Sequence, residues 1–115
     1  MTFSLIIPAY NVAPYIKECL DSVLSQSYQD WEAICVDDGS TDETLSILQQ
    51  YAKKDVRIKV YSQPNQKQAA ARNKAFSLCS GDYVVMLDSD DILVPGFLEL
   101  LNVFINKKYN IVEAP

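Results

Sequence analysis

The run Tyr83-Val84-Val85-Met86-Leu87-Asp88-Ser89-Asp90-Asp91 decides how this sequence is interpreted, because five apolar residues lead directly into three carboxylates within four positions. A continuous apolar run bounded by turn signals, here Gly81 and Asp82, predicts a strand buried on both faces of a sheet. The acids then fall at the strand's carboxyl end, where open α/β sheets bind their ligands. Three clustered anions repel one another, so we expect a divalent cation to offset them. The alternative is a solvated acidic turn that caps the next helix.

The composition limits the classes of function that are open to the chain. Its 115 residues form one domain at most, and a net charge of −5 does not suit a nucleic-acid-binding protein. The absence of His excludes Ser-His-Asp triads and His–Cys zinc sites. Three widely spaced cysteines among apolar residues favour a reducing compartment, so we expect a cytoplasmic protein. No apolar run reaches the length of a membrane span. If the full-length protein associates with a membrane, we expect it to do so peripherally and through residues outside this segment.

Strand and helix signals alternate along the whole chain. Strands are predicted at residues 3–7, 31–36, 57–61 and 83–87, with a fifth starting at 110–113. Pro8 is expected to end the first strand, and the third is expected at or near an edge. Helices are predicted at about 13–26, from a capping box at Ser40 to about 53, at about 68–78 with Phe76 facing inward, and from Pro95 onward. Four strand–helix repeats predict a three-layer α/β/α fold with a mainly parallel sheet.

Three loops are predicted to meet at one rim of that sheet, because all parallel strands end on the same side. These loops are residues 8–11, 37–40 and 88–91, and Arg72 at the start of the third helix lies near them. Tyr10 can lie against a nucleobase, a carboxylate can accept hydrogen bonds from a base or ribose, and Arg72 can bind phosphate or a base carbonyl. Each residue also has a structural interpretation: a covered strand end, a turn, or a surface ion pair. Their predicted convergence favours a nucleotide site.

Four segments in order resemble the motifs of the inverting family 2 glycosyltransferases. They are Ser4-Leu5-Ile6-Ile7-Pro8-Ala9-Tyr10-Asn11, Val36-Asp37-Asp38-Gly39-Ser40-Thr41-Asp42, Ala71-Arg72-Asn73 and Leu87-Asp88-Ser89-Asp90-Asp91. The resemblance implies the GT-A fold, a Rossmann-like architecture shared by nucleotide-diphospho-sugar transferases. It also implies transfer of a sugar with inversion, most often from a UDP-sugar, to a saccharide or lipid-linked acceptor in polysaccharide or glycolipid synthesis.

The resemblance also implies roles for individual residues. Pro8, Ala9, Tyr10 and Asn11 would line the nucleoside pocket, Asp38 would contact the base, and Arg72 the base or diphosphate. Asp88-Ser89-Asp90 would be the family's DXD signature, with Asp88 near the ribose or a metal-bound water and Ser89 among the substrate-binding residues. Asp90, together with Asp88, would coordinate Mn²⁺ or Mg²⁺. The ion would stabilise the departing nucleotide diphosphate.

Two departures from the family pattern limit this interpretation. Gln66-Lys67-Gln68 stands where family members often carry glycines, which leaves donor specificity open. Inverting transfer also needs a general base, which this family places in its second half, so we expect the base beyond residue 115 and assign none here. We therefore expect residues 1–115 to be the donor-binding part of a GT-A domain whose acceptor-binding half is absent, and the fragment alone to be inactive.

Three other functions stay open on the sequence. A haloacid-dehalogenase-type phosphotransferase also has an Asp-x-Asp after a buried strand, although near the start of its fold. A response-regulator-like module has paired acids at a strand end, and a non-catalytic nucleotide-binding module needs no base. A dinucleotide-binding domain is not favoured, because no glycine-rich turn follows the first strand.

Overall fold

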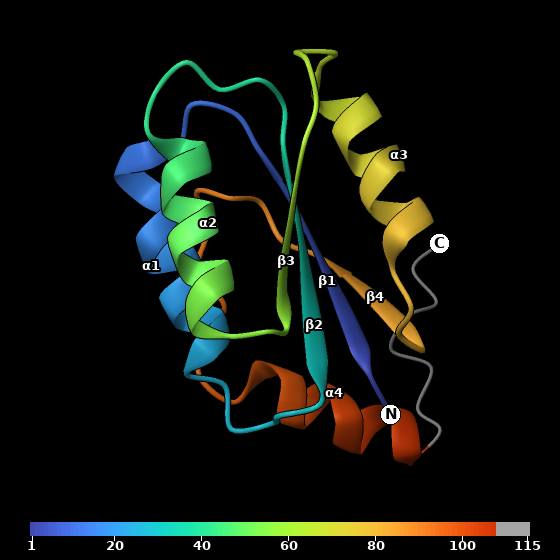
Figure 1. The fold of residues 1–115 in the computed structure, drawn as a ribbon. Helices are drawn as coiled ribbons and strands as arrows, with labels where there is room; N and C mark the ends of the chain where they lie inside the picture. The colour runs from blue at the N-terminus through green and yellow to red at the C-terminus, as the bar shows by residue number, and fades with distance from the viewer. Residues whose placement is uncertain (108–115) are drawn as a thin grey trace.

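The computed structural model describes residues 1–107, apart from the side chain of Gln68, as a parallel sheet between layers of helices (Figure 1). The elements are β1 (Phe3–Ala9), α1 (Ala13–Leu24), β2 (Trp31–Asp37), α2 (Thr44–Lys54), β3 (Ile58–Ser62), α3 (Gln68–Leu78), β4 (Tyr83–Met86) and α4 (Phe97–Asn106). The strand order is β3-β2-β1-β4, and every pairing is parallel. Helices α1 and α2 cover one face of the sheet and α3 covers the other (Figure 1). The predicted three-layer α/β/α fold is confirmed, and β3 lies at an edge as expected. The strand predicted at 110–113 lies outside the described residues.

The strands buried on both faces are β1 and β2, not β4 as we predicted. All seven residues of β1 are buried, and they pair with β2 from Phe3↔Trp31 to Ala9↔Asp37. β4 is an edge of the described sheet, and Tyr83, Val84 and Met86 are 41%, 39% and 45% exposed. The apolar run was a correct signal for a strand, but composition does not say which neighbours cover it. Helix α3 packs its buried Ala71 and Ala75 over β1 and β2, and this leaves β4 open.

The first strand continues through Pro8 to Ala9, although we expected it to stop at the proline. The carbonyl of Ile6 accepts a hydrogen bond from the N–H of Leu87 at 3.0 Å, so the backbone of Ile6 faces β4. Because alternate residues of a strand direct their backbone groups to the same neighbour, the backbone of Pro8 also faces β4. β4 ends at Met86, opposite Ile6. No ladder hydrogen bond is therefore lost at Pro8, which is the condition under which a strand tolerates proline.

Two helices begin later than the sequence patterns predict. The prediction of a capping box at Ser40 is wrong, because α2 begins at Thr44. The N–H and the hydroxyl of Thr44 both donate to Asp42 Oδ1, at 2.9 and 2.6 Å. Helix α4 begins at Phe97 rather than Pro95, because residues 94–97 form a turn in which the N–H of Phe97 donates to the carbonyl of Val94 at 3.2 Å. Proline followed by a glycine at positive φ is the pattern of a type II turn.

The inward face of α3 is narrower than predicted. Ala71 and Ala75 are buried, but Phe76 is 46% exposed because it lies one position beyond that stripe. Within residues 1–107, no helix combines the length and the apolar character that crossing a membrane requires.

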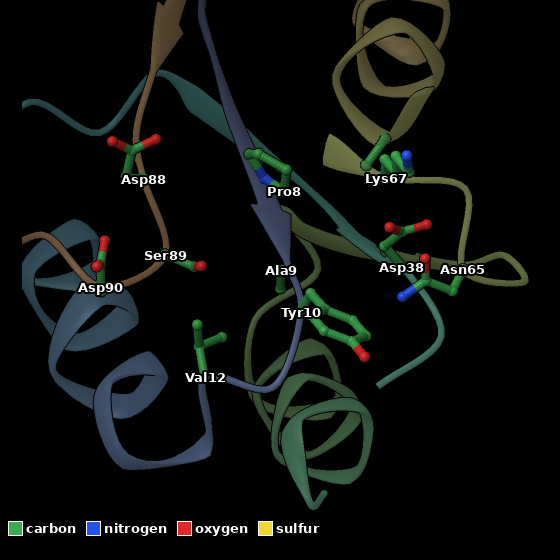
Figure 2. Close-up of a pocket in the computed structure, with 11 residues that line it drawn as sticks. Pro8, Ala9, Tyr10, Val12, Asp38, Asn65, Lys67, Asp88, Ser89 and Asp90 are labelled. Carbon is green, nitrogen blue, oxygen red and sulfur yellow. The ribbon is translucent and has the colours of Figure 1, made fainter. Parts of the chain in front are cut away.

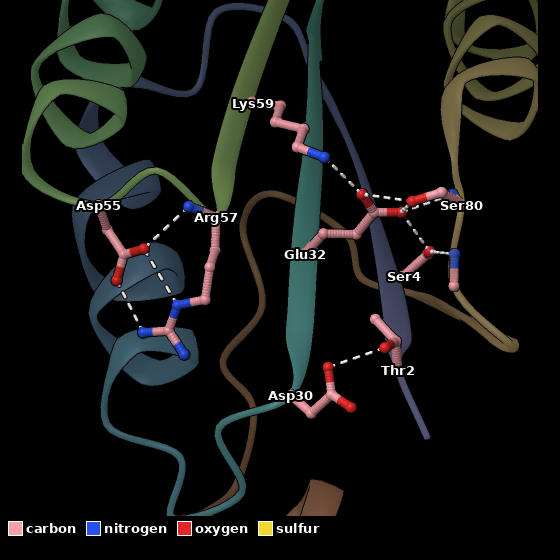
Figure 3. A network of polar contacts seen from close by, with 9 residues as sticks. Thr2, Ser4, Asp30, Glu32, Asp55, Arg57, Lys59 and Ser80 are labelled. Atoms are coloured by element: carbon pink, nitrogen blue, oxygen red, sulfur yellow. Dashed lines mark hydrogen bonds and ion pairs between the residues drawn. The ribbon is translucent and has the colours of Figure 1, made fainter.

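The buried carboxylate of Glu32 connects neighbouring strands of the sheet through hydrogen bonds (Figure 3). Glu32 on β2 is 5% exposed and accepts hydrogen bonds from Ser4 Oγ on β1 at 2.6 Å, from Ser80 N at 2.6 Å and from Lys59 Nζ on β3 at 2.8 Å. Burial alone would raise the pKa of Glu32, but the hydrogen bonds from Lys59, Ser4 and Ser80 outweigh it and lower the pKa to about 2. Glu32 therefore stays ionised and joins three strands to the segment before β4.

Replacing Glu32 by Ala should lower the free energy of unfolding by about 2 to 4 kcal/mol, because the buried Ser4 hydroxyl and the Ser80 N–H lose their acceptor. Lys59→Ala is the matched control. The Lys59 side chain is 44% exposed and can return to water, but its loss leaves one oxygen of the buried Glu32 carboxylate unpaired. Lys59→Ala should therefore cost about 1 to 2 kcal/mol, less than Glu32→Ala, because Ser4 and Ser80 keep their acceptor. Urea denaturation measures both values, and equal losses in the two variants would contradict this account.

The same carboxylate should make stability depend on pH. The pKa of Glu32 is about 2 in the folded chain and near its ordinary value of 4.5 in the unfolded chain, so its contribution is complete above about pH 4.5 and is lost as the pH falls toward 2. Wild type and Glu32→Gln should therefore differ by a constant free energy of unfolding between about pH 5 and 7, and the difference should shrink below about pH 4.5. A difference that stays constant down to about pH 3 would show that Glu32 has no lowered pKa.

The loops at the carboxyl ends of β2 and β3 touch at Gly39. A Cβ at Gly39 would lie 2.6 Å from the backbone N of Asn65, and Gly39 has φ +72°. Gly96 has a similar φ of +78°, but nothing lies within 4 Å of the position that a Cβ would take there. A side chain at position 39 would therefore collide with the loop after β3, whereas a side chain at position 96 would meet nothing.

Comparison of Gly39→Ala with Gly96→Ala separates backbone strain from this contact. In both variants an alanine must adopt a positive φ, which lowers the free energy of unfolding by about 1 kcal/mol. Gly39→Ala must also displace the loop that contains Asn65, so its free energy of unfolding should fall by at least about 2 kcal/mol. Chemical denaturation of the two proteins gives the values. Equal losses would mean that the loops can separate without cost.

Candidate functional site

A pocket of about 480 Å³ opens at the rim where β1, β2 and β4 end (Figure 2). Its volume is within the range of small-molecule sites in proteins. Its walls come from four loops and the start of α3, and the lining residues are Pro8, Ala9, Tyr10, Val12, Asp38, Asn65, Lys67, Ala71, Asp88, Ser89 and Asp90. Segments that are far apart in the sequence thus form one concave surface.

Seven of the nine site residues chosen from the sequence line this pocket: Pro8, Ala9, Tyr10, Asp38, Asp88, Ser89 and Asp90. Figure 2 shows Asp38 and Asn65 on one side of the strand end that carries Ala9 and Tyr10, with Asp88 and Asp90 on the other side. The Tyr10 side chain is exposed between them, where a flat ligand could lie against it. The pocket therefore has two polar ends joined by an apolar and aromatic floor.

Asn11 does not line the pocket, and its side chain joins two loops instead. Its Oδ1 accepts hydrogen bonds from the N–H of Thr41 at 2.8 Å and of Asp42 at 3.3 Å, and its own N–H donates to Ser40 Oγ at 3.0 Å. Asn11 has φ +49°, a conformation that Asn tolerates better than most residues. Its position indicates that it holds the loop after β1 against the loop after β2.

Arg72 lies beside the pocket rather than in its wall. It follows Ala71, which lines the pocket, and its side chain is half-buried. Its Nε is buried and has no hydrogen-bond partner within the described part of the chain. The guanidinium therefore keeps an unused donor close to the site.

Asp88, Asp90 and Asp91 form a cluster in which one carboxylate oxygen of each lies within 4.8 Å of the others. All three are exposed, whereas Ser89 between them is 7% exposed. Carboxylate oxygens grouped in this way are the donors that Mg²⁺ and Mn²⁺ prefer, so the residues present fit a divalent cation. Asp91 is an addition to the two ligands expected from the sequence.

Cys19 lies beneath this cluster but is not a further ligand. Its Sγ donates to the backbone carbonyl of Asp88 at 3.8 Å. Burial, and then the negative charges of Asp91, Asp90 and Asp88, raise the pKa of Cys19 to about 12. The thiol is therefore protonated at neutral pH, and a thiolate is what binds metals.

At the other end of the pocket, Asp38 is almost completely buried, with 3% exposure. Its Oδ1 accepts two hydrogen bonds, from Gln63 Nε2 at 2.9 Å and from the backbone N–H of Gln66 at 2.8 Å. Its backbone N–H donates to the carbonyl of Ala9 at 2.8 Å. The carboxylate is therefore held between the end of β1 and the loop after β3.

The loop after β3 is the part of the site that sequence reasoning missed. It supplies Asn65 and Lys67 to the pocket wall, whereas the sequence analysis singled out Lys67 only as a departure from the family pattern and did not single out Asn65. The signal was present, because a loop that leaves the carboxyl end of a parallel strand belongs to the same rim as the others. Lys67 has φ 76° and ψ 164°, a conformation that is nearly restricted to glycine.

The charges in the pocket wall are mostly negative. Among the lining side chains of the described residues, Asp38, Asp88 and Asp90 face a single basic residue, Lys67. An anionic ligand such as a diphosphate would meet net repulsion at the acidic end unless a cation lies between.

Comparison with known proteins gives the family. Residues 4–113 match the sequence family described as glycosyl transferase family 2. A chondroitin synthase of Escherichia coli is 46% identical over 97 residues, which cover 84% of this chain and 14% of that protein.

Solved structures agree with this match. The crystal structure of S. aureus TarS 1-349 in complex with UDP-GlcNAc superposes with a TM-score of 0.87 at 36% identity, covering 93% of this chain and 32% of that one. A mannosyltransferase from Pyrobaculum calidifontis in complex with GDP-Man and Mn²⁺ has a TM-score of 0.71 at 31% identity, covering 80% and 28%. The chain thus spans about a third or less of these relatives. On the match over residues 4–113, the chain belongs to glycosyl transferase family 2.

Proposed function

We propose that this chain forms the donor-binding part of an enzyme that transfers a sugar from a UDP-sugar to an acceptor hydroxyl, with inversion and with a divalent cation. The observation that carries the proposal is the pocket that brings Tyr10, Asp38 and the Asp88–Asp90 pair together from three separate loops. A nucleoside diphosphate has a flat base at one end and anionic oxygens at the other, which matches the two polar ends of the pocket.

The relatives support the choice of donor and the class of product. TarS was solved with UDP-GlcNAc, and the Escherichia coli relative is named a chondroitin synthase, which makes a polysaccharide. A saccharide or lipid-linked acceptor and a role in polysaccharide or glycolipid synthesis follow for this chain as part of the proposal. We assign no general base to the described residues, and we place it in the acceptor-binding part of the full-length enzyme.

In this proposal each group of residues has its own task. Tyr10 lies along the base, and Asp38 accepts a hydrogen bond from it with the oxygen that Gln63 and Gln66 leave free. Asp90 and Asp88 would hold Mn²⁺ or Mg²⁺. When bound, the ion supplies positive charge that stabilises the departing nucleoside diphosphate. Arg72 brings a second positive charge next to the pocket.

The phosphotransferase alternative has no support in the comparisons, since the matching family and the relatives named above are glycosyltransferases. A nucleotide-binding module without catalysis remains an outcome that the experiment below can distinguish.

Titration calorimetry with UDP in the presence of Mn²⁺ tests the site. Asp90→Ala should weaken UDP binding at least about tenfold, because it removes one carboxylate from a site where the cation screens the diphosphate. Glu18→Ala removes the same charge from an exposed position on α1 and should leave the affinity unchanged. Removal of Mn²⁺ with a chelator should weaken wild-type binding to the level of Asp90→Ala.

Three results would count against the proposal. Equal UDP affinity in wild type and Asp90→Ala would remove the metal assignment. No UDP binding by wild type, together with phosphate release from a phosphate ester, would favour the phosphotransferase. UDP binding without any transfer from UDP-GlcNAc by the full-length protein would leave a binding module.

A further inference from the structure

The Asp38 carboxylate is anchored through one of its two oxygens only. Both hydrogen bonds to it, from Gln63 Nε2 and from the backbone N–H of Gln66, arrive at Oδ1. Within the described residues no hydrogen bond reaches Oδ2, although Asp38 lines the pocket. One oxygen is therefore fixed by the protein, and the other is left for whatever fills this end of the pocket.

The chemistry of the contact settles the orientation of the Gln63 amide. An ionised carboxylate only accepts hydrogen bonds, so the amide NH₂ of Gln63 must face Asp38. Gln63 thus acts on the direction of the Asp38 side chain.

Gln63 is itself held rigidly. Its side chain is buried, with 9% exposure, and its backbone N–H donates to the carbonyl of Asp37 at 3.0 Å, which continues the pairing of β3 with β2 by one residue. Pro64 follows and restricts the chain as it leaves the strand. Gln63 is absent from the pocket wall, and its side-chain hydrogen bond reaches the pocket through Asp38.

We propose that Gln63 is the positioning residue that makes this site select a nucleobase with a ring N–H, the uracil type, by fixing the orientation of Asp38 as an acceptor. The inference rests on the proposed function and adds the residue that sets the specificity for the base. Uracil presents an N–H at ring position 3, which can donate to Asp38 Oδ2. Cytosine has an unprotonated nitrogen at the same position, and its lone pair would face the carboxylate. Its nearest donor is the exocyclic amine, which an immobile carboxylate cannot turn to meet.

The experiment compares the affinities of the protein for UDP and CDP, in the same Mn²⁺ buffer, by titration calorimetry. Wild type should prefer UDP by about tenfold or more, the effect of one hydrogen bond to a charged group. Gln63→Met keeps the length of the side chain and removes the donor, so the carboxylate can rotate, and the preference for UDP should fall by about tenfold. The ratio of the two affinities is the decisive measurement, because a general loosening of the fold would weaken both nucleotides equally.

Two further variants make the result specific. Gln66→Ala is the matched control: Gln66 contributes through its backbone N–H, which alanine retains, so the UDP preference should stay at the wild-type value. Gln63→Glu has nearly the shape of glutamine but places a second carboxylate beside Asp38, and the repulsion should reduce the preference as in Gln63→Met. Thermal unfolding shows whether Gln63→Met folds. If it does not fold, Gln63→Glu alone tests whether the UDP preference depends on Gln63.

The possible outcomes separate this inference from the function on which it rests. If wild type prefers UDP and both Gln63 variants keep that preference, the positioning role is overturned while the nucleotide site stands. If the two nucleotides weaken by the same factor, Gln63 is a structural residue only. If wild type binds neither nucleotide, the proposed function fails and the inference fails with it.

Discussion

The structure depends on the burial of β1 between two parallel neighbours. Its seven residues are in contact with protein on both faces, and its register places Phe3 opposite both Trp31 and Tyr83. A slip of one residue would exchange the faces of Leu5 and Ile6 and would turn Ser4 away from Glu32, so the buried hydrogen bond between Ser4 and Glu32 favours one register. Because β2 and β4 run in the same direction as β1, their carboxyl ends must lie at one rim. The convergence of Tyr10, Asp38 and Asp88 follows from this pairing rather than from any local preference.

The sheet brings the loops to one rim, but contacts between loops give the pocket its shape. Asn11 joins the loop after β1 to the loop after β2, and Gly39 allows the latter to touch Asn65 in the loop after β3. Asp38 then receives hydrogen bonds from Gln63 and Gln66 of that third loop. Each loop is thus held by the next, and the last residues of β1 and β2 add backbone hydrogen bonds to Asp38 and Gln63. Such a site can be rigid without being part of the hydrophobic core.

The sequence predicted the architecture and most of the pocket wall, because apolar periodicity identifies the strands and the carboxyl ends of parallel strands share one rim. It failed where the result depends on distant neighbours. The run before Asp88 is apolar enough for a buried strand, yet β4 is exposed because no described element covers its outer side. Arg72 and Asn11 have the right chemistry and the right position in sequence, but the orientation of their side chains depends on contacts that no local pattern contains. Ser40 and Pro95 carried valid helix-start signals that were outweighed by Asp42 and by the turn at Gly96.

The backbone of Lys67 shows how these requirements compete. Two groups three positions apart, the Gln63 side chain and the Gln66 N–H, must both reach Asp38 Oδ1. Helix α3 must then begin at Gln68. The chain has only Lys67 in which to reverse direction, and that residue takes φ 76° and ψ 164°. For a residue with a side chain this conformation costs about 1 to 3 kcal/mol, a cost that the surrounding contacts must offset. Glycine would avoid the strain, but it would also remove the lysine charge from the pocket wall. The strain at Lys67 is therefore the consequence of fixing Asp38 and keeping a positive charge in the same short loop.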